Sequence, residues 1–188
     1  EVPARFDPWA PLDVAAPPNL LTSFKLARAS ADPDACRRAL ATADLDLTPL
    51  PDRSTGPGCG FENAVRIERT SVAVGEAFSL SCRAALSLAM WERHDLQQAA
   101  RTHLGSEVRA IEHLGSYACR NLYGEAGSRR SQHATADAVD IAGFVLADGR
   151  RIRVLRDWQA SDAAAGASAQ AVDPAAEARF LRAVRDGA

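Results

Sequence analysis

Several features that would assign this chain to a familiar class of protein are missing from it. No apolar run approaches the roughly 20 residues that cross a bilayer, and the start of the chain lacks the charged and apolar regions of a signal peptide. Lysine occurs once, as Lys25, and no block of like charge is present. Nucleic-acid and anionic membrane surfaces usually bind a basic stripe, so we expect no nucleic-acid partner and no membrane contact of this segment.

The composition is that of an ordinary globular chain. The 188 residues suit one domain, with 47% hydrophobic residues, 24% charged residues and a net charge of −2. Because the first residue is Glu1 and not Met, we expect a mature or trimmed chain whose targeting signal has been removed.

Four cysteines are scattered along the chain without a Cys-x-x-Cys pair, which disfavours a zinc knuckle or a thioredoxin-type motif. They are Cys36, Cys59, Cys82 and Cys119. An even number suits two disulfides in an oxidising compartment, and it equally suits four buried thiols in the cytosol. The count alone leaves both interpretations open.

Helix and strand patterns follow one another without regular alternation, which predicts an α+β fold with a small antiparallel sheet and flanking helices. The proline-rich residues 1–20 predict an extended arm, and residues 21–188 the domain itself. We expect helices from Asp32-Pro33 to about Ala43, from Ser79 to Leu104, and from Asp173-Pro174 onward. We expect strands at Ala64–Arg69 and Val108–Leu114, a hairpin turn at Asp148-Gly149, a long loop over 44–60, and a mobile low-complexity stretch over Ser161–Gln170.

The chemistry concentrates in residues 131–140. Asp140 lies in an apolar, strand-like run, where an unpartnered carboxylate would be costly and needs a cation. His133 precedes it on a loop, and a histidine and a carboxylate that converge at a strand end are suitable Zn²⁺ ligands. The alternatives are a structural His133–Asp140 pair and a salt bridge between Asp140 and Arg120. His94, His103 and His113 are poor metal candidates, and we interpret Asp137 as structural.

This segment resembles the pattern Ser-x-His-x-x-Gly-x-Ala-x-Asp of zinc D-alanyl-D-alanine carboxypeptidases and peptidoglycan endopeptidases of the M15/LAS type. Ser131, His133, Ala138 and Asp140 match it, and Ala136 replaces the glycine.

The resemblance extends along nearly the whole chain to the bacterial extensin-like C-terminal domain family. The matching blocks are Asp7-Pro8-Trp9, Lys25-Leu26, Cys36-Arg37, Cys59-Gly60, Cys82, Trp91-Glu92-Arg93, Ser116-Tyr117-Ala118-Cys119-Arg120, Asp157-Trp158 and residues 180–188.

The resemblance implies a site and a compartment. His133 and Asp140 would be zinc ligands, Arg120 would stabilise the oxyanion, Tyr117 would contact substrate, and Ser131 would support catalysis or simply cap the loop. The family pattern continues past Ala188 to an Asp-His-Phe-His segment, which carries the third ligand and the general base. We therefore expect the site in the chain as given to be incomplete and the chain to be a poor enzyme.

The resemblance also implies a protein exported to the bacterial periplasm or cell envelope, which favours disulfides. Joining Cys36 to Cys59 would restrict the proline-rich loop and leave Cys82 to pair with Cys119, although four cysteines allow three pairings.

The expected function is a zinc-dependent peptidase-like domain that acts on the stem peptides or cross-links of peptidoglycan. A non-catalytic peptidoglycan-binding or envelope scaffold module is the main alternative. A disulfide-stabilised interaction protein with neither metal nor muropeptide is a third possibility.

Overall fold

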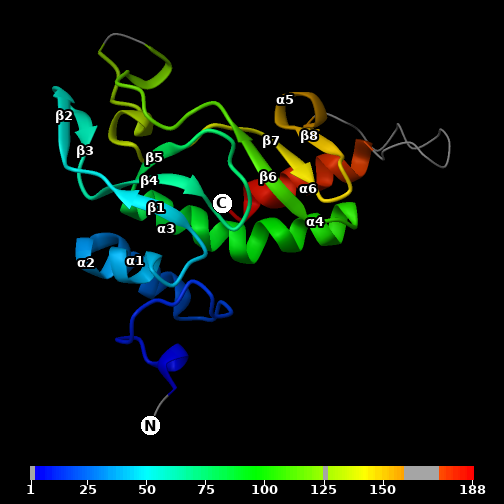
Figure 1. The fold of residues 1–188 in the computed structure, drawn as a ribbon, viewed down its shortest axis with the longest axis horizontal. Coiled ribbons are helices and arrows are strands. Elements are labelled where there is room, and N and C mark those ends of the chain that lie inside the picture. Colours follow the sequence, from blue (N-terminus) through cyan, green and yellow to red (C-terminus); the bar gives the residue numbers. More distant parts are fainter. Residues whose placement is uncertain (1–2, 125–126, 159–173) are drawn as a thin grey trace.

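The computed structural model describes residues 3–124, 127–158 and 174–188, and it has the α+β architecture that the sequence predicts (Figure 1). Its helices and strands, in chain order, are η1 (Ala4–Phe6), α1 (Thr22–Ala31), α2 (Pro33–Leu40), β1 (Asp46–Pro49), β2 (Arg53–Gly56), β3 (Cys59–Phe61), β4 (Ala64–Arg69), β5 (Phe78–Ser81), α3 (Cys82–Trp91), the π-helical segment η2 (Glu92–Leu96), α4 (Gln97–Leu104), β6 (Val108–His113), η3 (Leu122–Gly124), η4 (Gln132–Thr135), β7 (Ile141–Leu146), β8 (Arg151–Arg153), α5 (Val154–Asp157) and α6 (Pro174–Asp186). None of the described helices is long and apolar enough to cross a membrane.

The strands form small antiparallel sheets along one side of a long central helix, which α3, η2 and α4 build end to end (Figure 1). One sheet has the order β1-β4-β5, a second has the order β6-β7-β8, and β2 and β3 form a separate hairpin. Two hydrophobic cores lie along this helix. The first joins α1, α2, β4 and β5 to α3, and the second joins β6, β7 and α6 to η2 and α4. Leu88 packs against both cores, so the helix is the common support of both sheets.

Several predicted boundaries are confirmed. Asp32 caps α2, because its carboxylate accepts a hydrogen bond from the backbone N–H of Ala35 at 2.6 Å, and Pro33 is the first helical residue. Gly105 ends α4 in the left-handed conformation, with φ 63°. The Asp148-Gly149 turn joins β7 to β8 as expected.

Other expectations were wrong or are not tested. Ser79, Leu80 and Ser81 belong to β5, so the helix begins at Cys82 with Ser81 as its N-cap. The expected loop over 44–60 contains β1, β2 and the start of β3. β1 pairs with β4, farther along the chain, whereas β2 and β3 pair with each other in a local hairpin. We did not anticipate α1. The low-complexity stretch Ser161–Gln170 lies outside the described residues.

The four cysteines form two disulfides, Cys36–Cys82 and Cys59–Cys119, so the expectation of disulfides is confirmed and the expected pairing is wrong. The first bridge ties α2 to the start of α3 inside the first core, and the second ties the β2–β3 hairpin to the segment before Arg120. The bridges span 46 and 60 residues. Each would contribute about 4 kcal/mol by restricting the unfolded chain.

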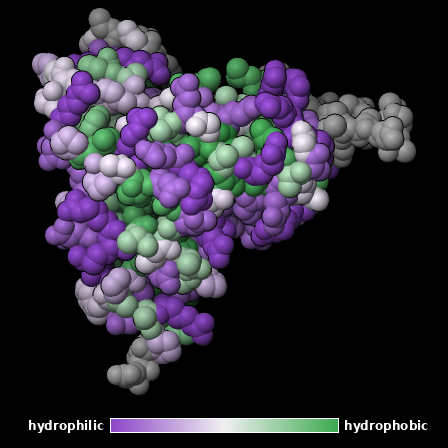
Figure 2. Space-filling view, viewed as in Figure 1, coloured by the Kyte–Doolittle hydropathy of each residue, from purple (hydrophilic) through white to green (hydrophobic). Residues whose placement is uncertain are grey.

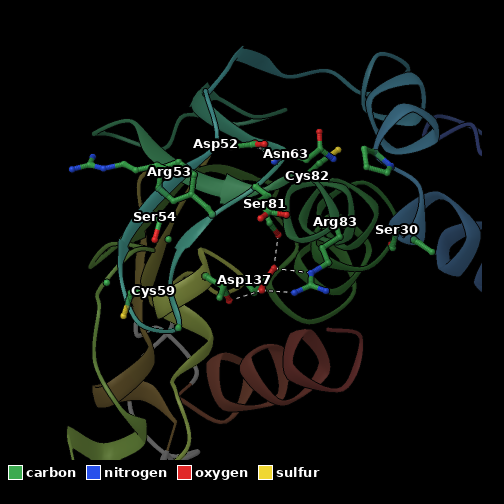
Figure 3. Close-up of a pocket in the computed structure, with 18 residues that line it drawn as sticks. Ser30, Asp52, Arg53, Ser54, Cys59, Asn63, Ser81, Cys82, Arg83 and Asp137 are labelled. Atoms are coloured by element: carbon green, nitrogen blue, oxygen red, sulfur yellow. Dashed lines mark hydrogen bonds and ion pairs between the residues drawn. The ribbon is translucent and has the colours of Figure 1, made fainter.

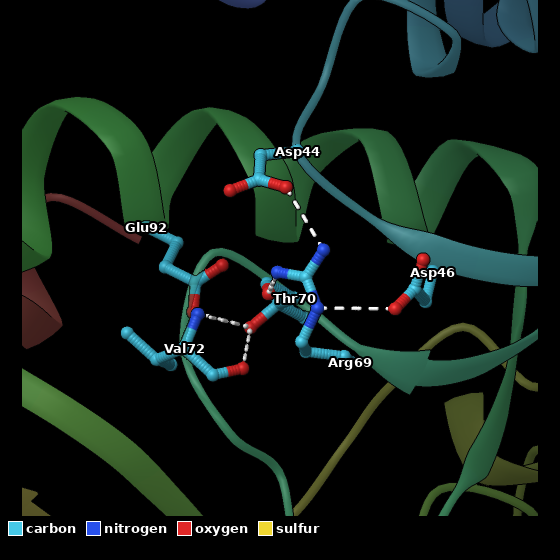
Figure 4. Close-up of polar contacts among 6 residues, drawn as sticks. All are labelled: Asp44, Asp46, Arg69, Thr70, Val72 and Glu92. Carbon is cyan, nitrogen blue, oxygen red and sulfur yellow. Dashed lines mark hydrogen bonds and ion pairs between the residues drawn. The ribbon is translucent and has the colours of Figure 1, made fainter.

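A buried carboxyl group lies at the start of the π-helical segment. Glu92 is 1% exposed, and its Oε1 lies 2.6 Å from the hydroxyl of Thr70 (Figure 4). That hydroxyl also lies 3.1 Å from the carbonyl oxygen of Val72, yet it has one proton to donate. The hydroxyl donates to Glu92 at the shorter of the two distances. Burial raises the pKa of Glu92, and hydrogen bonds from Thr70 and Ser71 oppose that shift without cancelling it.

Candidate functional site

Residues 131–137 form a short, anchored loop beside the segment that follows Ser116. The backbone N–H of Ser131 donates to the carbonyl of Arg120 at 3.1 Å, and the N–H of Ala118 donates to the carbonyl of His133 at 3.0 Å. The 3-10 helix η4 then ends at Ala136, whose φ is 55°. The peptidase pattern that this segment resembles has glycine at this position. A left-handed backbone explains a glycine there, and here alanine adopts the same conformation.

The loop brings His133 and Asp140 together. Nε2 of His133 lies 3.3 Å from Oδ1 of Asp140. The imidazole is largely buried, at 13% side-chain exposure, but the carboxylate is 53% exposed. The expectation that Asp140 lies buried inside a strand was therefore wrong. Asp140 comes directly before β7, where its backbone pairs with Leu114 and Gly115 and its side chain stays accessible.

The hydrogen bonds of His133 determine which nitrogen carries the proton. Nδ1 lies 3.0 Å from the backbone carbonyl oxygen of Ser116, which can only accept a hydrogen bond. In a neutral ring Nδ1 must therefore hold the proton, and Nε2 directs its lone pair toward the carboxylate of Asp140. Two acceptors that face each other at 3.3 Å repel unless a proton or a cation lies between them. The pair therefore has the arrangement of a charged His133–Asp140 ion pair or of a metal site.

The geometry of the pair fits two ligands of one zinc ion. Zinc ligands at about 2.0–2.1 Å with tetrahedral angles lie about 3.3 Å from each other. A backbone carbonyl on the second imidazole nitrogen is the usual support of a metal-bound histidine. Within the described residues, no group of three or more His, Cys, Asp or Glu side chains could hold a metal ion. A zinc site that used His133 and Asp140 would need at least one further ligand.

Arg120 and Tyr117 lie on the segment that supports His133, but within the described residues no hydrogen bond or ion pair joins their side chains to His133 or Asp140. Arg120 is exposed, and no ion pair links it to Asp140 among the described residues, so the salt-bridge alternative is not observed. The Tyr117 hydroxyl hydrogen-bonds to the hydroxyl of Thr55, and its ring packs edge-on against Phe61 at 5.4 Å.

Ser131 acts locally as a cap. It is 8% exposed, and its hydroxyl accepts a hydrogen bond from the backbone N–H of His133 at 3.3 Å. This contact orients the start of η4, which carries His133.

Two other histidines use their rings elsewhere. Nε2 of His94 contacts the carbonyl of Val14 at 2.8 Å, and Nε2 of His113 contacts the carbonyl of Glu76 at 2.8 Å. The ring of His113 also packs on Phe78.

A polar cluster that sequence reasoning missed holds the other side of the same loop. The carboxylate of Asp137 accepts hydrogen bonds from Nε of Arg83 at 2.8 Å and from the hydroxyl of Thr135 at 2.6 Å, and it also contacts Nη2 of Arg83 and the hydroxyl of Ser81 (Figure 3). The N–H of Ser81 donates to the carbonyl of Ala136 at 2.8 Å. We call this set (Ser81, Arg83, Thr135 and Asp137) the Asp137 clamp. Burial alone would raise the pKa of Asp137, but the hydrogen bonds from Arg83, Ser81 and Thr135 together hold it below its usual value.

Grooves lie on both sides of the Asp137 clamp. A polar groove of about 680 Å³ extends from it between the β2–β3 hairpin and the starts of α2 and α3 (Figure 3). A second groove of about 680 Å³ runs along α3, where Leu88 and Trp91 face Val139 and Ile141. Both grooves reach the loop at Asp137, but neither is lined by His133 or Asp140.

Comparison with known proteins gives one match. The family model described as "Extensin-like protein C-terminus" matches residues 34–188. No curated protein and no solved structure matches the chain.

Proposed function

Because the chain belongs to the extensin-like protein C-terminus family, we propose that it is a zinc-dependent, peptidase-like domain that acts on peptidoglycan peptides in the bacterial cell envelope. The observation that carries this proposal is the His133–Asp140 pair, with Nε2 facing Oδ1 at 3.3 Å and Nδ1 held by the carbonyl of Ser116. A buried histidine with a fixed tautomer beside an accessible carboxylate is a donor set that suits zinc.

The remaining roles are part of the same proposal. Bound zinc would supply a Lewis acid that lowers the pKa of water. His133 and Asp140 would hold the ion, and Ser131 would keep η4 in place. Arg120, exposed on the adjoining segment, would contact the developing oxyanion, and Tyr117 the substrate. By resemblance, a third ligand and the general base would come from a segment after Ala188.

Two observations agree with an exported peptidase-like domain. The two disulfides fit an oxidising compartment such as the periplasm. The grooves on either side of the Asp137 clamp are of a size that accepts a short peptide or a muropeptide.

A non-catalytic peptidoglycan-binding module is the second candidate. It is favoured by the two-ligand set, because no third ligand is found within residues 3–124, 127–158 and 174–188. Such a module would keep the grooves and the fold without hydrolysis.

A zinc titration combined with a muropeptide digest tests the proposal. We expect the 188-residue chain to bind zinc weakly and to release no product, because two protein ligands leave at least two zinc positions to water. A chain extended through a downstream Asp-x-x-His segment should bind zinc tightly and cleave. In this extended chain, His133→Ala should abolish both zinc binding and cleavage. His94→Ala, which changes a histidine outside the site, should abolish neither. Zinc binding that survives His133→Ala would contradict the proposed ligands, and tight zinc binding without cleavage would favour the binding module.

A further inference from the structure

An exposed aromatic and basic surface lies in the N-terminal part of the chain, far from the proposed zinc pair in sequence. Its apolar members are Phe6, Trp9, Leu20 and Phe24, which are 51%, 71%, 101% and 44% exposed. Its basic members are Arg5 and Arg28. We call these six residues the N-terminal patch. Exposed apolar side chains that lie together mark interaction sites, whereas single ones are ordinary.

The patch is a defined surface, because the arm that carries it is fixed to α1. The Lys25 ammonium donates to the carbonyl of Ala4 at 2.7 Å, Arg28 donates to the carbonyl of Pro8 at 2.8 Å, and Asn19 donates to the carbonyl of Arg5 at 2.9 Å. The rings of Trp9 and Phe24 meet edge to face at 6.1 Å. Figure 2 shows apolar and hydrophilic residues side by side over this lower part of the molecule.

The two arginines cover the rings and leave their charge available. The Arg28 guanidinium lies 5.1 Å from the Trp9 ring and 5.9 Å from the Phe24 ring, and that of Arg5 lies 4.7 Å from the Phe6 ring. Neither arginine forms an ion pair with a carboxylate among the described residues. The nearby carboxylate of Asp7 accepts a hydrogen bond from the backbone N–H of Trp9. This hydrogen bond does not neutralise the carboxylate, so Arg5, Arg28 and Asp7 together give the aromatic surface a formal net charge of +1.

These features distinguish between possible occupants. A sugar stacks on an open ring face, but the guanidinium of Arg28 already lies over Trp9 and Phe24. A two-fold contact with a second copy would bring two patches of like net charge together, which costs energy. An anionic bilayer surface meets both parts of the patch, since aromatic and leucine side chains enter the headgroup region while arginines meet the lipid phosphates.

We propose that the N-terminal patch docks the protein on the surface of an anionic phospholipid bilayer. The absence of a basic stripe led us to expect no membrane contact. That expectation considers only charge along the sequence, and a patch of two arginines and four apolar side chains brought together by the fold leaves no such trace. Docking is independent of the proposed zinc chemistry, because no member of the patch belongs to the loop over 131–140.

Vesicle sedimentation tests the proposal with the intact 188-residue chain. The probes are vesicles of phosphatidylglycerol and phosphatidylethanolamine, with pure phosphatidylcholine vesicles for comparison. We expect binding to the anionic vesicles that weakens as salt is raised. Trp9→Ala/Phe24→Ala should weaken this binding at least about tenfold, and Arg28→Gln should weaken it about fivefold. Leu155→Ala removes an equally exposed apolar side chain, 94% exposed on α5, and should leave binding unchanged.

Each of the following outcomes would overturn the proposal. Absence of binding to anionic vesicles, or equal binding by the double variant or by Arg28→Gln, contradicts docking through the patch. Binding of chitooligosaccharides that depends on Trp9 would assign the surface to sugar. A dimer in analytical ultracentrifugation that Trp9→Ala/Phe24→Ala abolishes would assign it to a second copy. Circular dichroism confirms that each variant is folded, and the single Arg28→Gln change keeps the test valid if the double variant is not.

Discussion

Asp137 and Arg83, 54 residues apart in the sequence, join the loop that carries His133 to the start of α3. Nε of Arg83 donates to Oδ1 of Asp137 at 2.8 Å, and the Asp137 side chain is only 8% exposed. Because Asp137 lies between His133 and Asp140 in the chain, this ion pair holds the proposed ligand loop in place.

Removing the arginine should loosen that loop. Arg83→Met leaves a largely buried carboxylate without its cation, although Arg83 itself is 60% exposed and solvent weakens the pair. We expect a loss of unfolding free energy of about 1–2 kcal/mol, between the values for exposed and for buried pairs. Chemical denaturation at pH 7 measures it. Arg101→Met, which breaks the exposed pair with Glu107, should change stability by less than about 0.5 kcal/mol. Equal losses of stability in the two variants would show that the Arg83–Asp137 pair contributes no more than an exposed ion pair.

The stability of the protein at acid pH should depend on the same Arg83–Asp137 pair. The folded-state pKa of Asp137 is lowered, so its contribution to stability is present above the unfolded pKa of about 4 and is lost as pH falls through the folded value. Asp137→Asn should therefore be less stable than the wild type at pH 7 and should approach it below about pH 3. Denaturation midpoints from pH 2 to pH 7 measure this. A stability difference that does not change with pH would contradict the role of the ionised carboxylate.

Glu92 should behave in the opposite way. Its folded-state pKa is raised by burial, so the stability linked to its protonated form is fully present below the unfolded pKa of about 4.3 and is lost as pH rises through the folded value. Glu92→Gln mimics the neutral acid beside Thr70. We expect the variant to match the wild type near pH 4 and to exceed it in stability at pH 8, by on the order of 1 kcal/mol. A variant that is less stable at pH 8 would mean that the ionised carboxylate is the stabilising form.

The two disulfides should differ in their reactivity. Cys36 and Cys82 are each 1% exposed, whereas Cys119 is exposed at the surface. A reductant can reach the Cys59–Cys119 sulfurs without unfolding, so limited reduction should open this bridge first. Alkylation followed by peptide mapping identifies the free thiols. Early labelling of Cys36 and Cys82 would contradict the placement of that bridge inside the first core.

Local signals in the sequence predicted several elements whose cause is local. The cap at Asp32-Pro33, the stop at Gly105 and the turn at Asp148-Gly149 each depend on a few neighbouring residues, and each was predicted correctly. The β2–β3 hairpin was missed although its turn at Pro57-Gly58 is local. The strand β1 was missed because its order comes from pairing with β4, farther along the chain. The expected disulfide pairing failed for a similar reason, because proximity in sequence says little about which helix ends meet in space.

The proposed site also combines local features, which the sequence predicted, with long-range features, which it did not. The spacing of His133 and Asp140 is a local pattern, and the structure brings the two side chains together. The exposure of Asp140 was not foreseen, since the apolar run that follows it resembles a buried strand from its first residue. Two partners of Asp137 in the clamp left no local signal, because Ser81 belongs to β5 and Arg83 to α3; only Thr135 is close to it in the chain. Only a matching residue pattern in relatives, or the fold itself, could have revealed Arg83.

The most direct test of the zinc proposal is anomalous diffraction at the zinc absorption edge from crystals of this chain soaked in millimolar zinc. A peak within about 2.0–2.2 Å of both Nε2 of His133 and a carboxylate oxygen of Asp140 is the expected result. The same peak should vanish in Asp140→Ala crystals. A His133–Asp140 pair that remains in direct contact at 3.3 Å with no anomalous density, while zinc is found at His94, His103 or His113 or nowhere, would contradict it.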